Sequence, residues 1–218
     1  MEDVIEVYER PYDEQYPVIC FDESNKQQIQ DVIELIPAAS GRAKRIDAEY
    51  KRNGTSNIFM TFEPLSGYRE VKVTTRRTRN DFAYVMKDLV DSERYHEAEK
   101  ITVVLDNLNI HSKGSLYTAF KPEEAKRIAD RLEFHYTPKR GSWLNMAELE
   151  LSTLSRQCLK RRIKDQQMMK EEIAAWEEER NLKGIKGHWT FTIEKARRKM
   201  RKVYPQPHIY EETNLKEY

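Results

Sequence analysis

Two apolar runs that each end on an aspartate are the clearest features of the hydrophobic pattern. Val18–Phe21 leads into Asp22, and Ile101–Leu105 leads into Asp106. Runs of consecutive apolar and β-branched residues are typical of strands that are buried on both faces of a sheet. We therefore predict a buried strand at each position, with an aspartate at its end.

Three further segments have the character of strands. Ile58–Phe62 is a short apolar run, and Glu63–Gly67 after it has the proline, serine and glycine of a turn. Tyr68–Thr75 alternates apolar and polar residues in the strand period, so these two segments should form a hairpin. Leu132–Tyr136, closed by Pro138, is expected to be the last strand.

Elsewhere the hydrophobic period is that of amphipathic helices, with apolar residues three and four positions apart. Pro122, followed by two glutamates, is a typical helix start. The predicted helices are Asp81–Val90, a segment that begins at Pro122, a segment from Leu144 to Cys158, and a segment around 166–180.

The order of these elements predicts the fold class. Three strands come first, and strands and helices then alternate before two final helices. This order favours an α/β fold in which a three-strand antiparallel meander and parallel strands form one mixed sheet flanked by helices. That arrangement is the ribonuclease-H-like topology. A flavodoxin-like sheet is disfavoured because the first predicted helix follows only after three strands.

Composition and charge divide the chain further. The 218 residues carry a net charge of only +1, with 39% apolar and 34% charged residues, as in a globular protein. Eight Lys or Arg residues lie between Lys183 and Lys202, against the single acid Glu194. We predict a lead-in segment at 1–16, a catalytic domain at 17–182 and a basic C-terminal extension at 183–218. For residues 23–54, which carry scattered charges, we predict irregular structure with weak strands at most.

Several classes of protein are disfavoured. Cys20 and Cys158 are isolated, which argues against a cysteine zinc site and a disulfide framework. No apolar run approaches the ~20 residues of a membrane helix, and the acidic N-terminus lacks the apolar core of a signal peptide. We expect a cytoplasmic, nucleoid-associated protein without a membrane partner. No glycine-rich phosphate loop follows a strand, which argues against a small-molecule phosphotransferase.

The two aspartates suggest a chemistry when they are considered together. Ligands collect at the ends of strands beside a switch in sheet topology, where Asp22 and Asp106 would both lie. Two buried carboxylates repel each other, and a divalent cation relieves that repulsion. Taken singly, each aspartate is more often a turn former or a helix cap, and Glu148 on a helix is more often solvated.

Three motifs resemble those of the Tc/mariner superfamily of DDE transposases, in its bacterial insertion-sequence branch. The segment VVLDNLNIH, Val103–His111, resembles the one that carries the second aspartate. The segment HYTPKRGSWLNMAE, His135–Glu148, resembles the one that carries the third acid, and Val18–Glu23 matches the first strand. The resemblance implies hydrolysis of DNA at transposon ends, followed by in-line strand transfer into target DNA.

The resemblance also implies a metal site. Asp22, Asp106 and Glu148 would be the catalytic residues and would hold two Mg²⁺ ions, with Mn²⁺ as a substitute. The interval between Asp106 and Glu148 is longer than is usual in the superfamily, and the extra length can be accommodated around 117–124. Glu150 competes with Glu148, but residues two apart on a helix point about 200° apart, so only one can face the metal. The register of Leu144–Glu148 favours Glu148.

Two polar residues beyond Asp106 have open roles. His111 contacts the scissile phosphate, supports the site, or is a structural histidine whose hydrogen bonds are satisfied at a helix start. Asn107 positions a metal-bound water or caps the following helix. Both are candidate substrate-binding residues under the resemblance.

Other residues are candidate DNA contacts. Lys139 and Arg140, near the third acid, are suited to phosphates. Trp143 either stacks on an unpaired base or packs its loop onto the sheet. Arg197 and Arg198 belong to a basic cluster that either follows a DNA backbone or forms a solvated terminal helix.

The expected partner is double-stranded DNA, both transposon ends and target. The resemblance implies a homodimer on DNA. Relatives carry helix-turn-helix domains ahead of the catalytic domain, so a separate helix-turn-helix segment is expected to recognise the ends. Two alternatives stay open: a ribonuclease-H-like nuclease without strand transfer, and an inactive or regulatory transposase fragment.

Overall fold

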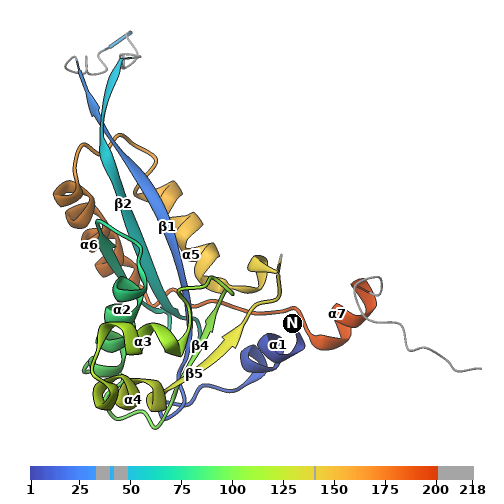
Figure 1. Cartoon of the computed structure of the whole chain (residues 1–218). Coiled ribbons are helices and arrows are strands. Elements are labelled where there is room, and N and C mark those ends of the chain that lie inside the picture. Colours follow the sequence, from blue (N-terminus) through green and yellow to red (C-terminus); the bar gives the residue numbers. More distant parts are fainter. Residues whose placement is uncertain (33–39, 42–48, 140, 201–218) are drawn as a thin grey trace, which may run out of the picture.

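The computed structural model describes residues 1–32, 40–41, 49–139 and 141–200. A mixed five-stranded sheet in the order β3-β2-β1-β4-β5 forms its centre (Figure 1). β1, β2 and β3 are antiparallel neighbours, whereas β4 and β5 run parallel to β1. The strands are β1 (Val18–Asp31), β2 (Tyr50–Glu63), β3 (Tyr68–Thr74), β4 (Ile101–Leu105) and β5 (Leu132–Tyr136). The predicted antiparallel meander and parallel strands are confirmed.

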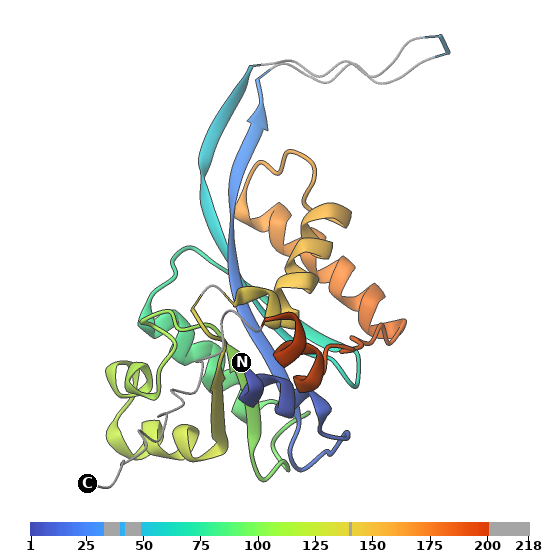
Figure 2. The same cartoon turned by 90° about the vertical axis from the view of Figure 1, so that its right-hand side faces the viewer.

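Helices cover both faces of this sheet (Figure 2). On one face, the helices that follow β3 and β4 pack on Phe21 and Phe59. On the other face, the N-terminal helix and the helices after β5 pack in the core that contains Cys20 and Met60. The helices are α1 (Glu2–Glu9), α2 (Arg79–Asp91), α3 (Lys113–Ala119), α4 (Pro122–Arg131), α5 (Met146–Gln157), α6 (Gln166–Leu182) and α7 (Ile193–Lys199), with a 3₁₀ turn at Ser142–Leu144.

β1 and β2 extend well past the sheet as a two-stranded arm (Figure 1). The prediction of irregular structure over 23–54 is wrong for residues 23–31 and 50–54, which belong to β1 and β2 and pair in the register Glu23 to Asp31 with Phe59 to Tyr50. Contacts from the loop between α5 and α6 support the arm, since Ile29 donates its backbone N–H to the carbonyl of Ile163 at 2.7 Å. Residues 33–39 and 42–48 of the range lie outside the described residues.

The N-terminal segment forms a helix that packs on the sheet. Residues 2–9 form α1, whose Val4, Ile5 and Val7 are buried in the core beside α5. Tyr8 extends from α1 and donates its hydroxyl hydrogen to the carbonyl of Leu144 at 2.8 Å. The predicted lead-in segment thus contains a helix, and α1 contacts the segment that leads into α5.

α6 covers the edge strand β3. Glu177 accepts the backbone N–H of Val71 at 2.8 Å, and Asn181 pairs with both the N–H and the carbonyl of Arg69. The side chains of Glu177 and Asn181 thus form hydrogen bonds with backbone groups of β3 that would otherwise be free to pair with the strand of another protein. Among the described residues, no helix is both long and apolar enough to cross a membrane.

Candidate active site

The sheet register brings the two aspartates together. Cys20 in β1 pairs in parallel with Val104 in β4. Asp22 and Asp106 each lie two residues beyond this pair, so they come at the same end of two neighbouring segments. Burial is the largest cause that raises the pKa of Asp22, to about 7. The nearby charges of Glu23, Glu148 and Asp106 raise it further, against the backbone N–H of Glu23. All three predicted acids therefore belong to one electrostatic neighbourhood.

Glu148 lies in the first turn of α5, and one asparagine holds that turn against β1. Asn145 caps α5 by accepting the N–H of Ala147 at 3.1 Å. Its side-chain amide donates to the carbonyl of Phe21 at 2.7 Å, next to Asp22. The predicted Leu-Asn motif thus connects the third acid to the strand that carries the first.

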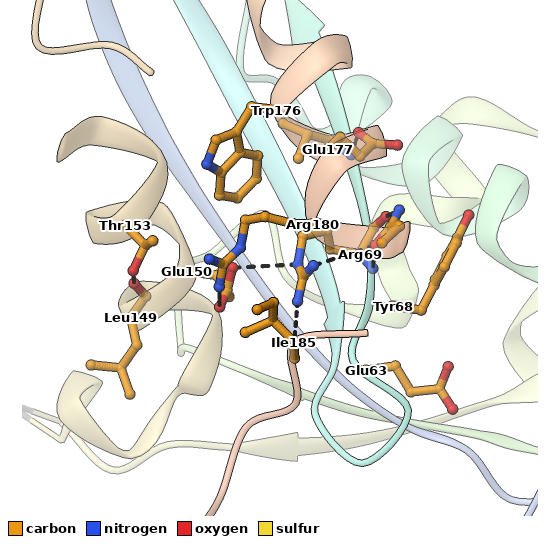
Figure 3. A network of polar contacts seen from close by, with 12 residues as sticks. Glu63, Tyr68, Arg69, Leu149, Glu150, Thr153, Trp176, Glu177, Arg180 and Ile185 are labelled. Carbon is orange, nitrogen blue, oxygen red and sulfur yellow. Dashed lines mark hydrogen bonds and ion pairs between the residues drawn. The ribbon is translucent and has the colours of Figure 1, made fainter. Parts of the chain in front are cut away.

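Glu150 has a different environment (Figure 3). Its carboxylate lies 3.3 Å from Nε of Arg69 and 2.7 Å from the guanidinium of Arg180. The Arg69 side chain is completely buried and also donates to the carbonyl of Ile185 at 2.6 Å. Glu150 is therefore engaged by two arginines of β3 and α6, which favours Glu148 as the third acid.

The three acids lie near one another but do not converge as a complete set of metal ligands. No three histidine, cysteine, aspartate or glutamate side chains within the described ranges converge on a point where they could hold a metal ion. Magnesium is commonly bound through one or two carboxylates together with substrate phosphates and water. Burial and, to a smaller extent, the neighbouring carboxylates raise the pKa of Asp22, and such a group of acids fits a cation in chemistry and in charge.

His111 lies inside the protein between two carboxylates. Its Nδ1 is 2.6 Å from Oδ1 of Asp106, and its Nε2 is 2.9 Å from Oε2 of Glu23. Burial lowers the pKa of His111, but the two acids outweigh it and raise that pKa to about 9. The ring also packs against Phe21 and Phe82. Both ring nitrogens are thus occupied by carboxylates, which disfavours direct contact with a DNA phosphate and fits either a supporting or a structural role.

Sequence reasoning missed Glu23 and Arg77. Glu23 follows Asp22 on a strand, so it points to the opposite face, toward His111. Arg77, in the loop before α2, donates to the other oxygen of Glu23 at 3.3 Å. The only available signal was an acidic residue immediately after an apolar strand, next to a candidate catalytic residue.

A cavity of about 420 Å³ adjoins Asp106. Asn107, which lines it, donates its amide hydrogen to the carbonyl of Thr137 at 2.6 Å and so connects the loops after β4 and β5. This contact differs from the helix cap that was one of its predicted roles. The cavity is further lined by Leu108, Pro138, Lys139 and Ser142. Lys139 is exposed there, and Arg140 lies outside the described residues.

The aromatic and basic candidates occupy a second surface. Trp143 is 44% exposed and stacks on Trp189, with ring centroids 6.4 Å apart. Phe191 completes this group and lies near the ammonium of Lys199 in α7. The remaining predicted contacts are both in α7: Arg197 pairs with Glu2 of α1 at 2.7 Å, and Arg198 is exposed.

Solved structures show which fold this is. The Mos1 mariner paired-end complex with Mn matches with a TM-score of 0.52 and 13% identity, over 84% of this chain and 55% of that one. The Mos1 transposase paired-end complex with the left transposon end matches with a TM-score of 0.53 and 14% identity, over 84% and 56%. This likeness establishes the fold and confirms the predicted ribonuclease-H-like class. The chain spans little more than half the length of the Mos1 chains.

Sequence comparison shows the family. The model of the DDE superfamily endonuclease family matches residues 17–170. The chain therefore belongs to that family, and the resemblance to DDE transposases is confirmed at that level. Its place in the Tc/mariner superfamily stays a prediction, as does the bacterial insertion-sequence branch. A comparison with curated protein sequences finds no match.

Proposed function

We propose that this chain is the catalytic domain of a DNA transposase in which Asp22, Asp106 and Glu148 hold two Mg²⁺ ions. One observation carries the proposal: the parallel register of β1 and β4 brings Asp22 beside Asp106, and Asn145 connects the start of α5, which carries Glu148, to the strand next to Asp22. Such a carboxylate group is unfavourable alone and favourable around cations. When bound, the two cations supply Lewis acidity for the attacking and the departing oxygen of a phosphodiester.

The side chains of this chain would carry out the remaining tasks. Exposed Lys139, beside the cavity next to Asp106, and its sequence neighbour Arg140 would bind phosphates of the DNA strand. Trp143 would stack on an unpaired base near the cut, because its ring is half-exposed. Arg197 and Arg198 in α7 would contact the DNA backbone on the same side as that aromatic group.

The wider assembly is part of the proposal. The partners are double-stranded DNA at transposon ends and target sites, with a second copy of the chain and a separate helix-turn-helix segment. Both Mos1 structures are paired-end complexes, which supports a partnership with DNA. We place the reaction in the cytoplasm at the nucleoid, with Mn²⁺ able to replace Mg²⁺.

Cleavage of labelled transposon-end DNA in Mg²⁺ or Mn²⁺ tests the activity. Asp22→Asn, Asp106→Asn and Glu148→Gln should each abolish cleavage, whereas Glu133→Gln, a half-exposed acid of β5, should not. Activity that survives all three substitutions would contradict the proposed site.

Two further measurements separate the alternatives. A nuclease without strand transfer would cut DNA but would join no pre-cut end to a target plasmid. An inactive fragment would neither cut DNA nor bind Mn²⁺ in a way that depends on Asp22. A joined product that requires Asp22 would favour the transposase over both.

A further inference from the structure

The arrangement around His111 is more specific than its packing requires. The side chains of His111 and Glu23 are 0% and 3% exposed, so this pair is shielded from water at the border of the proposed site. Buried charged groups persist where they are paired, because desolvation penalises them strongly otherwise. The two ring nitrogens of His111 face carboxylates from different segments: Glu23 of β1 and Asp106 directly after β4.

The alternation of β1 explains how one strand serves two purposes. Cys20 packs toward α5, and Asp22, two residues later, shares that face. Phe21 packs toward α2, and Glu23 shares its face, where His111 lies against Phe21. Adjacent acids thus point in opposite directions, one toward Glu148 and one toward His111.

Asp106 is fixed through one of its oxygens. Oδ1 of Asp106 accepts the backbone N–H of Leu108 at 3.0 Å and lies 2.6 Å from Nδ1 of His111. Its other oxygen, Oδ2, receives no hydrogen bond from any residue in the described ranges. The carboxylate is therefore held by one oxygen and offers the other.

We infer that Glu23 is a positioning residue that holds His111, which in turn orients Asp106 to bind a cation through its second oxygen. Arg77 holds the far oxygen of Glu23, so both ends of that carboxylate are anchored. This inference rests on the proposed metal-dependent function. Residues that orient a metal ligand typically change metal affinity by about 10–100-fold when they are replaced.

Binding of Mn²⁺ alone to the full chain tests the inference, measured by electron paramagnetic resonance without DNA. Glu23→Ala should raise the dissociation constant by up to roughly 100-fold. Glu23→Gln, which keeps an acceptor for the imidazole, should raise it by roughly 10-fold. Glu133→Gln is the matched control because Glu133 lies 3.3 Å from another buried histidine, His135, outside the site, and should leave the affinity unchanged.

A double substitution tests whether Glu23 acts through His111. His111→Ala should weaken Mn²⁺ binding, and adding Glu23→Ala should weaken it no further, because the link is already broken. Additive effects would overturn the inference, as would an unchanged affinity in a folded Glu23→Ala chain. Thermal unfolding without metal shows whether each variant folds, and Glu23→Gln decides the question if Glu23→Ala does not.

The same Mn²⁺ titration distinguishes a wrong proposed function from a wrong role for Glu23 alone. Asp22→Asn should abolish the strongest Mn²⁺ site of the unaltered chain. If the unaltered chain binds no Mn²⁺, or if Asp22→Asn has no effect, the proposed site and the role of Glu23 are both wrong. If Asp22→Asn abolishes binding while both Glu23 variants bind normally, only the role of Glu23 is wrong.

Discussion

Glu150 and Glu148 are two residues apart on one helix, and the structure predicts opposite consequences for their loss. Glu150→Ala removes the acid that faces Arg69 and Arg180, whose side chains are 0% and 13% exposed. Removing one partner of a buried ion pair costs about 3–5 kcal/mol, because a desolvated charge is left uncompensated. For a chain of this size that cost lowers the melting temperature by roughly 6–20 °C.

Glu148→Ala should leave the melting temperature nearly unchanged. The side chain is half-buried and belongs to the first turn of α5, where its charge contributes about 0.3–1 kcal/mol through the helix dipole. Its repulsion with Asp22 acts in the opposite direction. Cleavage of DNA, in contrast, should be lost, because the substitution removes a proposed metal ligand.

Thermal unfolding without metal, followed by cleavage assays well below both melting temperatures, separates the two effects. Glu178→Ala, an exposed acid of α6, controls for loss of charge and should affect neither measurement. The reasoning would be refuted if Glu150→Ala melted like the unaltered chain. It would also be refuted if folded Glu150→Ala lost cleavage while Glu148→Ala kept it, since the third acid would then be Glu150.

Three other outcomes are expected. Burial raises the pKa of Glu177 to about 7, so the folded chain keeps a proton that the unfolded chain loses above its ordinary pKa near 4.5. The free energy of unfolding should therefore fall as the pH rises from about 4.5 to 7, by roughly 1–2 kcal/mol after discounting for solvent screening. Glu177→Gln should flatten this decline in melting curves across that range. Asp22→Asn should raise the metal-free melting temperature at pH 8, because it removes a buried charge beside other acids, and an unchanged value would contradict that cost. Trp143→Ala should weaken binding of DNA with unpaired ends by about 1–3 kcal/mol in a fluorescence titration, whereas fully paired DNA should bind equally well.

The sequence predicts the elements whose stability comes from their own apolar pattern. Two such elements are the strand segments Val18–Phe21 and Ile101–Leu105. Their patterns predict buried strands, and every residue in them is buried. The arm could not be predicted in this way, because residues 50–55 of β2 are exposed and polar. Its order depends on pairing with β1 and on the contact between Ile29 and Ile163, which are distant in sequence.

The candidate site shows the same division. Motif and strand pattern suffice to select Asp22 and Asp106, because both follow apolar runs. The choice between Glu148 and Glu150 needs the positions of Arg69 and Arg180, which come from other elements. The role of His111 likewise depends on Glu23, 88 positions earlier in the chain, and no periodicity within either segment reveals that contact.

Segments outside the predicted acids also control the geometry of the site. The hydroxyl of Tyr8, from α1, donates to Leu144 just before α5, and Asn145 donates to Phe21 just before Asp22. The start of α5 is therefore connected both to the N-terminal helix and to the central strand. Because a carboxylate site tolerates displacements of only about 0.5 Å, these buried contacts limit how far Glu148 can move from Asp22. The N-terminal helix thus takes part in the architecture that places the third acid, although it carries none of the proposed ligands.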